Sequence, residues 1–262
     1  MDLGLTGKTA LVTGASRGIG LAIAQELAAE GVRVVGAART ITPALEKVAA
    51  AAVSVDLSTT EGARGVVESA LSELGGIDIL VNNVGGGDAD RLELAGVLDT
   101  DDEQLRNLFD LNLFGVISTT RAALPSLLER GGTVISISSI NSRLPAVGPT
   151  GYSEAKAALA SFSKRLSEEF GPQGLRVNTV SPGPVATDIW HGENGLGAKL
   201  AKANGIGHEQ FLAAMPAQFN ITSGRISTPG EIAALVAFLA SERSANTHGA
   251  DFVVDGGILK IA

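Results

Sequence analysis

Short apolar runs alternate with longer amphipathic stretches along almost the whole chain. Runs rich in valine, isoleucine and leucine predict buried strands. These runs are Thr9–Val12, Val32–Val35, Val53–Val55, Ile77–Val81, Thr133–Ile137, Leu175–Val180 and Phe252–Val254. Apolar residues at helical spacing predict helices between them. One such helix carries Ile19, Ile23 and Leu27 and stops at Gly31, and the others are Gly62–Leu74, Tyr152–Phe170 and Glu231–Ala240.

A further helix start is indicated by Thr100-Asp101-Asp102-Glu103. The threonine and the glutamate stand three residues apart, which is the pattern of a capping box. We therefore expect a long helix to begin there and to run towards Leu128.

The alternation of strands and helices predicts an α/β fold, with a parallel sheet of about seven strands and helices on both faces. The 262 residues fit one doubly wound, Rossmann-type domain, 1–262, since such domains often reach roughly 250 residues. Ligands of these sheets bind beyond the carboxyl ends of the strands. Chemistry-bearing motifs are therefore expected directly after strands.

Composition narrows the classes of function. The chain has no cysteine, which excludes disulfides and thiolate chemistry, and no cluster of metal ligands is visible, so no metal is predicted. The net charge of −8 argues against a nucleic-acid partner. The longest apolar run, Ile232–Ala240, is too short to cross a membrane. With no signal-peptide pattern at the N-terminus, we expect a cytoplasmic protein without a membrane partner.

A glycine-rich loop lies between the first strand and the first helix, and it reads Thr13-Gly14-Ala15-Ser16-Arg17-Gly18-Ile19-Gly20. Glycines permit a tight turn and close backbone approach to a ligand, and the following helix offers free N–H groups to a pyrophosphate. An ordinary glycine-rich turn is the alternative. The loop predicts cofactor contacts from Gly14, Ser16, Arg17, Gly18, Ile19 and Gly20.

Tyr152, the only tyrosine of the chain, and Lys156 stand four residues apart on a predicted helix, so they share one face. A phenol with an unperturbed pKa of about 10 is a poor acid or base near neutrality. We expect the ammonium to lower the pKa of Tyr152 and so to make it a general acid or base towards a carbonyl or alcohol. A surface tyrosine beside a solvated lysine is the alternative.

Five motifs together resemble the short-chain dehydrogenase/reductase family over nearly the whole chain. They are Gly14-x3-Gly18-x-Gly20, Asn82-Asn83-Val84-Gly85, Ser139 with Tyr152 and Lys156, Ser181-Pro182-Gly183, and Asp255-Gly256-Gly257. Val84 departs from the commoner alanine. The resemblance implies catalysis by Asn112, Ser139, Tyr152 and Lys156: Ser139 would bond the substrate oxygen, Lys156 would also hold the nicotinamide ribose, and Asn112 would bend its helix and position a water. It also implies cofactor contacts from Asp56, Leu57, Asn83, Val84, Gly85, Pro182, Gly183, Val185 and Thr187.

Asn112 and Asp56 also admit plain structural readings. Asn112 would then be a polar residue tolerated within a helix, and Asp56 an ordinary turn or N-cap aspartate.

The end of the second strand indicates NADP(H) rather than NAD. An NAD site usually has an acidic residue there to bind the ribose diol, whereas this chain has Ala37 and Ala38 followed by Arg39. Arg17 and Arg39 could bracket a 2′-phosphate. The alternative is two ordinary surface arginines.

The segment 188–225 is the least regular part of the chain, with glycines and asparagines between Trp190, Phe211, Met215 and Phe219. The family resemblance implies a lid over the substrate, and the composition of the segment favours an apolar or mixed substrate. The alternative is a surface excursion that packs its own small cluster.

Two further functions stay open beside an NADPH-dependent carbonyl reductase. A 3-oxoacyl-acyl-carrier-protein reductase is one, although Leu128-Glu129-Arg130-Gly131 and Gly171-Pro172-Gln173-Gly174 offer little positive charge to an acidic carrier. A non-catalytic cofactor-binding module is the other. The resemblance also implies a homotetramer, or a homodimer.

Overall fold

The computed structural model describes residues 2–86 and 96–260. Within them, seven strands form one parallel sheet in the order β3-β2-β1-β4-β5-β6-β7. Their bounds are β1 Thr9–Thr13, β2 Arg33–Ala38, β3 Ala51–Ser54, β4 Ile79–Asn82, β5 Thr133–Ile137, β6 Arg176–Pro182 and β7 Asp251–Val254. The predicted α/β class and parallel sheet are confirmed.

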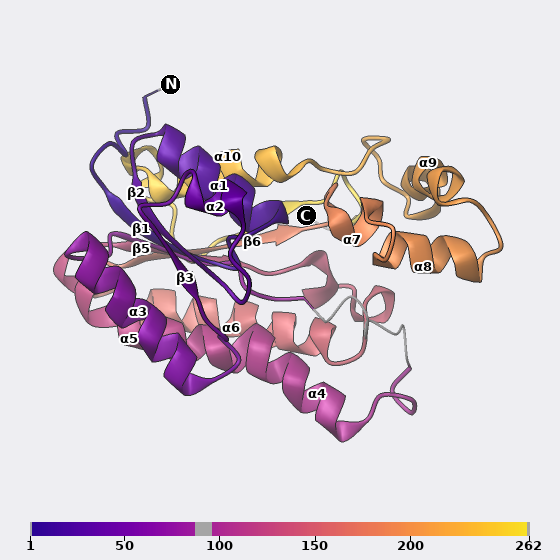
Figure 1. Ribbon diagram of the computed structural model, residues 1–262, viewed down its shortest axis with the longest axis horizontal. Helices are drawn as coiled ribbons and strands as arrows, with labels where there is room; N and C mark the ends of the chain where they lie inside the picture. The colour runs from indigo at the N-terminus through magenta and orange to yellow at the C-terminus, as the bar shows by residue number, and fades with distance from the viewer. Residues whose placement is uncertain (1, 87–95, 261–262) are drawn as a thin grey trace.

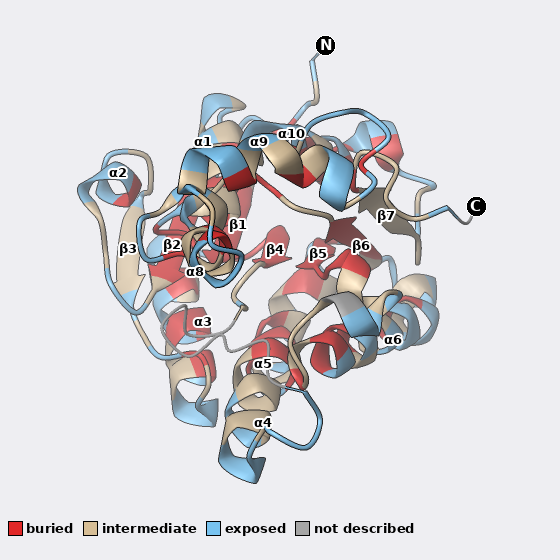
Figure 2. Ribbon diagram, turned by 90° about the vertical axis from the view of Figure 1, so that its right-hand side faces the viewer, coloured by how far each residue is buried: buried red, intermediate tan, exposed pale blue. Residues whose placement is uncertain are grey.

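Helices cover both faces of the sheet (Figure 1). The α-helices of the described residues are α1 Gly18–Ala29, α2 Pro43–Glu46, α3 Thr60–Leu74, α4 Asp102–Phe109, α5 Gly115–Glu129, α6 Tyr152–Phe170, α7 Asp188–His191, α8 Leu196–Ala203, α9 His208–Gln218 and α10 Pro229–Ala240. Helices α1 and α10 bury Ile23 and Val236 in one core, and α3, α5 and α6 bury Val66, Leu127 and Leu166 in the other. Figure 2 shows the buried residues gathered in the inner strands of the sheet and on the helix faces that cover them, whereas the edge strands β3 and β7 are mostly intermediate. None of the described helices is long and apolar enough to cross a membrane.

The order of strands reverses between β1 and β4. Strand β1 pairs with β2 on one side and with β4 on the other, and the chain moves outward from this point in both directions. The parallel register brings the carboxyl ends of β1, β4, β5 and β6 to one edge. The motifs that follow these strands therefore meet there, as expected for a doubly wound sheet.

The long helix differs from the prediction in its start and in its regularity. The capping box is formed by Asp101, whose carboxylate accepts a 2.7 Å hydrogen bond from the backbone of Gln104. The hydroxyl of Thr100 instead donates to the carbonyl oxygen of Gly96 in the preceding turn. The helix is interrupted: α4 is followed by a π-helical turn at Asp110–Phe114 and then by α5. The irregular turn is centred on Asn112, where the family resemblance implies a bend.

Candidate active site

Ser139, Tyr152 and Lys156 come together at the junction of β5 and α6. Ser139 begins the 3-10 turn Ile140–Ser142 just after β5, and its Oγ accepts a 3.1 Å hydrogen bond from the backbone N–H of Asn141. Tyr152 is the first residue of α6, and its phenol hydrogen-bonds the side chain of Ser139. Lys156, one turn further on, is only 2% exposed.

The electrostatics of the pair differ from the expectation. Burial raises the pKa of Tyr152, and the hydrogen bond with Ser139 only partly opposes this rise. Burial also lowers the pKa of Lys156 to about 8. The Lys156 ammonium lies 5.8 Å from the centroid of the Tyr152 ring and donates a 2.9 Å hydrogen bond to the carbonyl oxygen of Ile137. The expectation of a lowered pKa for Tyr152 is therefore wrong, because desolvation outweighs the hydrogen bond with Ser139, the one contribution that lowers this pKa.

Ser138 supports this site from behind. Its hydroxyl donates a 3.1 Å hydrogen bond to the carbonyl oxygen of Lys156. The side chain of Ser138 is thereby committed to α6, whereas that of Ser139 is shared with Tyr152. Of the two adjacent serines, Ser139 is therefore the one whose hydroxyl lies with Tyr152.

Asn112 lies at the centre of the π-helical turn and is fully buried. Its amide donates to the carbonyl oxygens of Gly86 and Leu108, and its Oδ1 accepts from the N–H of Gly86, each at 2.9 Å. A Cβ on Gly85 would lie 2.7 Å from Lys156 Nζ and 2.8 Å from Asn112 Oδ1. Asn112, Gly85 and Lys156 are thus in close contact, and Asn112 is more than a tolerated helix residue.

The glycine loop has the shape that a dinucleotide pyrophosphate requires. Gly14 and Gly18 have φ angles of 64° and 56°, which favour glycine. A Cβ on Gly14 would stand 2.9 Å from Asn83 Nδ2, which donates to the carbonyl oxygens of Thr13 and Gly14. The first turn of α1 contains no acidic residue, so no carboxylate of that turn competes with an anionic ligand for the N–H groups and the positive end of the helix dipole.

The loop after β6 closes the other side of this cradle. The Cγ2 atom of Thr187 would lie 3.3 Å from a Cβ on Gly18, and the hydroxyl of Thr187 makes no capping hydrogen bond to α7. Gly183 packs so closely on Asp255 that a Cβ would approach its Cα to 2.9 Å, and Val185 is buried and bridged to Ser227. The contact of Thr187 with Gly18 places this loop against the glycine loop, so both loops could contact one bound dinucleotide.

The two predicted 2′-phosphate ligands lie on loops that are tied to each other. Ser16 Oγ donates to the carbonyl oxygen of Thr40 at 2.5 Å, and Thr42 Oγ1 donates to that of Ser16 at 2.9 Å. Arg17 and Arg39, next to these contacts, are both exposed. Neither forms an ion pair within residues 2–86 and 96–260, so both guanidiniums are available to an anion.

Asp56 has the turn role that the sequence left open. Its Oδ1 accepts hydrogen bonds from the N–H and hydroxyl of Ser58, at 2.9 and 2.8 Å, and these bonds, with a smaller effect of Arg39, lower the pKa of Asp56. Leu57 beside it is buried, and its carbonyl oxygen occupies the place where a Cβ of Gly115 would stand. The backbone of Leu57 therefore packs directly on the start of α5.

The segment 188–225 contains helices α7, α8 and α9 and packs a cluster of its own. Phe211 is 2% exposed and Met215 is fully buried in it, and the rings of Trp190 and Phe219 meet edge to face at 5.8 Å. Phe211 and Met215 are therefore used by the segment itself, whereas Trp190 and Phe219 are only partly buried. The preference for an apolar or mixed substrate stays a prediction.

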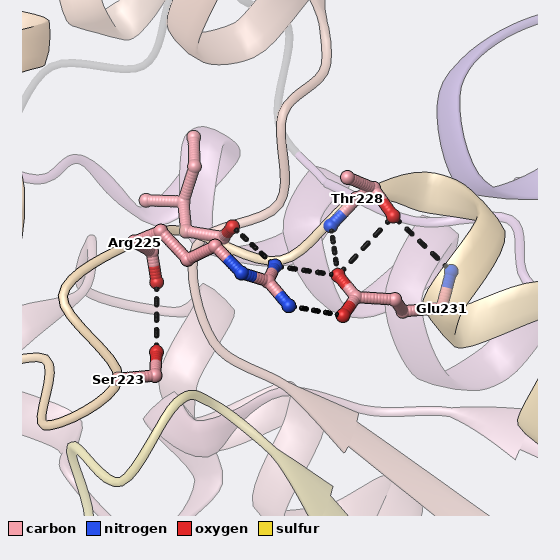
Figure 3. A network of polar contacts seen from close by, with 5 residues as sticks. Ser223, Arg225, Thr228 and Glu231 are labelled. Atoms are coloured by element: carbon pink, nitrogen blue, oxygen red, sulfur yellow. Dashed lines mark hydrogen bonds and ion pairs between the residues drawn. The ribbon is translucent and has the colours of Figure 1, made fainter.

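Sequence reasoning missed how this segment is anchored. Its end is held by Arg225, which forms a two-pronged ion pair with Glu231, and Glu231 also accepts from the N–H of Thr228 at 2.7 Å (Figure 3). Thr228 and Glu231 form a capping box on α10, which was visible as Thr-x-x-Glu. No comparable sequence motif predicts the ion pair of Arg225 with Glu231. Within the described residues, no group of histidine and acidic side chains could hold a metal ion.

The chain is similar to known proteins over almost its full length. A sequence profile described as Enoyl-(Acyl carrier protein) reductase matches residues 14–259. An uncharacterized oxidoreductase of Methylorubrum extorquens is 38% identical, covering 97% of this chain and 98% of its own length. The 3-oxoacyl-[acyl-carrier-protein] reductase FabG of Escherichia coli is 36% identical over 97% of this chain and 98% of its own. L-sorbose reductase from Gluconobacter frateurii, solved with NADPH and L-sorbose, is 35% identical, with a TM-score of 0.90 and all of both chains covered.

Proposed function

This chain belongs to the short-chain dehydrogenase/reductase family of oxidoreductases, and from this premise we propose that it reduces a ketone or aldehyde to an alcohol with NADPH. The observation that carries the proposal is the contact of Ser139, Tyr152 and Lys156 beside an anion cradle of glycines. Such an arrangement places a proton donor next to the place where a dinucleotide would bind.

Each side chain has a distinct task in this reaction. Bound nicotinamide would supply the hydride that adds to the carbonyl carbon. Ser139 hydrogen-bonds the carbonyl oxygen, and Tyr152 gives it the phenolic proton, which leaves an alcohol and a phenolate. The Lys156 ammonium stabilises that phenolate, and the phenol regains its proton from solvent. Oxidation of an alcohol is the reverse.

NADPH is preferred over NADH in this proposal because two exposed arginines lie on the loop after β2 and on the glycine loop tied to it, without an ion pair among the described residues. Arg17 and Arg39 offer charge-assisted hydrogen bonds to a 2′-phosphate, and Ala37 and Ala38 put no carboxylate in its way. L-sorbose reductase, solved with NADPH, supports this choice. The remaining cofactor contacts proposed from the family pattern are Ile19, Gly20, Asp56, Leu57, Val84 and Pro182.

The substrate proposed first is a small, polar ketone such as a ketose. The apolar side chains of the segment 188–225 lie in its own cluster, and the resemblance to L-sorbose reductase adds weight. In this proposal the segment, within the single domain 1–262, covers the substrate. We place the enzyme in the cytoplasm.

A second candidate is reduction of a 3-oxoacyl group on an acidic carrier protein, favoured by the likeness to FabG. The helix end that would meet such a carrier is weakly basic, because Arg130 is bound to Asp78 at 2.8 Å. The candidate is tested by comparing a 3-oxoacyl carrier protein with the same acyl group on a small thiol. A strong preference for the carrier would favour it.

The proposed assembly is a homotetramer, or a homodimer, built through the long helix, α6 and β7. Phe114, at the junction of α4 and α5, is 52% exposed and stacks only obliquely on Phe109. An exposed aromatic residue on a helical face suits association with a second copy. Sedimentation velocity of the intact protein measures the state directly.

The test of the function is NADPH oxidation, followed by absorbance, over a panel of ketoses, simple ketones, aldehydes and 3-oxoacyl thioesters. Tyr152→Phe, which removes only the hydroxyl, should lower kcat by about 10²–10⁴-fold and leave NADPH binding intact. Turnover that survives in Tyr152→Phe would contradict the assigned role. NADPH binding with no turnover on any substrate would instead indicate a non-catalytic cofactor-binding module.

A further inference from the structure

We propose that Asp251 is a positioning residue that holds the substrate side and the cofactor side of the active site together. The inference rests on the function proposed above. Asp251 is the first residue of the edge strand β7. Both oxygens of its carboxylate are engaged: Oδ2 accepts from Arg143 Nη2 at 2.8 Å, and Oδ1 accepts from Ser181 Oγ at 2.7 Å.

Arg143 carries this contact to the substrate side. It ends the 3-10 turn that Ser139 begins, and its N–H donates to the carbonyl oxygen of Ile140 at 2.9 Å. The next residue back, Ser142, donates from its hydroxyl to the carbonyl oxygen of Ser139 at 2.7 Å. A shift of Arg143 would therefore move the backbone of Ser139.

Ser181 carries the contact to the cofactor side. It is fully buried on β6 and is followed directly by Pro182 and Gly183. The N–H of Gly183 donates to the carbonyl oxygen of Val254 at 3.0 Å, which continues the pairing of β6 with β7. The Asp251 carboxylate thus joins the turn of Ser139 to the end of β6, which leads into Pro182 and Gly183, two of the proposed cofactor contacts.

The serine turn borders an open surface pocket on this side. The pocket, of about 280 Å³, is lined by Arg143 and Asp251, by the outer face of α6 at Ala157 and Ala160, and by Thr179 of β6. Arg143 is itself exposed, so close packing of the kind found in a core does not fix its side chain. The ion pair of Arg143 and Asp251 supplies the constraint, with its side chains 36% and 19% exposed.

The test separates the two sides by variants of each contact. Arg143→Met should lower kcat about tenfold and leave the Kd for NADPH unchanged, because displacement of a catalytic group by a fraction of an ångström has effects of this order. Ser181→Ala should raise the Kd for NADPH several-fold. Asp251→Ala should do both, and Arg143→Lys, which keeps the charge, should recover part of kcat.

Controls distinguish this role from plain stabilisation. Arg33→Met breaks a different surface ion pair, with Glu73, and should leave kcat and Kd unchanged. A fall in Tm for Asp251→Ala with kcat, KM and Kd all within twofold of wild type would overturn the inference. If the wild-type protein has no carbonyl reductase activity, the proposed function fails by itself. Amide hydrogen exchange then decides the inference: Asp251→Ala should exchange faster at both 139–143 and 181–183, and unchanged exchange would refute it.

Discussion

The Lys156 ammonium points to the carbonyl oxygen of Ile137, 2.9 Å away, and not to the Tyr152 phenol, whose ring centroid is 5.8 Å distant. Burial favours the neutral form of both groups, since it raises the pKa of Tyr152 and lowers that of Lys156 to about 8. A protonated phenol is the form that donates to a carbonyl. The protein itself is therefore prepared for reduction at neutral pH.

The first prediction concerns the pH dependence of reduction. Lys156 is charged below its pKa of about 8, and only the charged form stabilises the phenolate that Tyr152 leaves behind. We expect kcat/KM for carbonyl reduction to be constant at neutral pH and to fall as the pH rises through about 8. Profiles at saturating NADPH measure this. In Lys156→Arg, whose guanidinium stays charged, the inflection near 8 should be absent, and an unchanged inflection would assign it to another group.

Lys156 should also lower the stability of the fold. Its pKa falls from 10.5 to about 8, so the unfolded chain binds more protons between these values and stability increases with pH across that window. Burying the charge of Lys156 lowers the free energy of unfolding by up to about 3 kcal/mol at neutral pH. The hydrogen bond to Ile137 offsets about 1 kcal/mol of this loss. Lys156→Met should abolish turnover and yet raise the free energy of unfolding by about 1–2 kcal/mol at pH 7. Denaturant titration tests this, with exposed Lys164→Met as the neutral control.

Gly85 is predicted to be intolerant of a side chain. A Cβ there would stand 2.7 Å from Lys156 Nζ and 2.8 Å from Asn112 Oδ1, so one of these groups must move. Gly85→Ala should lower kcat by about 10²-fold. Gly65→Ala is the matched control, because Gly65 lies within α3 and a Cβ added to it would meet no atom within 4 Å; it should be neutral or slightly stabilising. Equal activity of the two variants would contradict the crowding argument.

Arg39 is predicted to set the choice of cofactor. Replacing a charge-assisted hydrogen bond, worth about 1.5–3 kcal/mol, by a repelling carboxylate should reduce the ratio of kcat/KM for NADPH to that for NADH by at least about tenfold. Arg39→Asp is the variant to measure. Arg33→Asp changes the net charge equally at the opposite end of β2 and should leave the ratio unchanged. If the kcat/KM of the wild-type enzyme with NADH equals or exceeds its kcat/KM with NADPH, the preference for NADPH is refuted.

The sheet was predictable because buried parallel strands are continuous apolar runs. The strand boundaries were harder to predict. Strand β2 extends beyond the apolar run through Gly36, Ala37 and Ala38, which have weak strand preference. Hydrogen bonding to β1 on one side and β3 on the other overrides this local propensity. The π-helical turn around Asn112 depends on its bonds to Gly86. That contact spans 26 residues, so the local helical pattern does not show it, and only the family resemblance indicated a bend at Asn112.

The candidate site also has features that the local sequence predicts and features that depend on tertiary contacts. The spacing of Ser139, Tyr152 and Lys156 and the glycine pattern are local, and they identified the residues that the structure brings together. The pKa direction of Tyr152 depends on desolvation, which spacing does not reveal. The bond of Arg143 to Asp251 joins residues 108 positions apart, and the cluster of α8 and α9 depends on which apolar residues meet. Both are tertiary properties.

The last prediction concerns acid stability, and it depends on Asp78 at the amino end of β4. Although burial alone would raise it, the hydrogen bonds from Arg130 and Thr9 hold the pKa of Asp78 below its usual value. A lowered carboxyl pKa contributes stability above the unfolded value of about 3.9 and loses it as the pH falls through the folded value. Asp78→Asn should therefore cost on the order of 1–3 kcal/mol at pH 7 and flatten the loss of stability below about pH 5. Asp99→Asn, an exposed aspartate, serves as the control in urea titrations from pH 7 to 3. If wild type and Asp78→Asn lose stability in parallel over this range, acid unfolding is governed by other carboxylates.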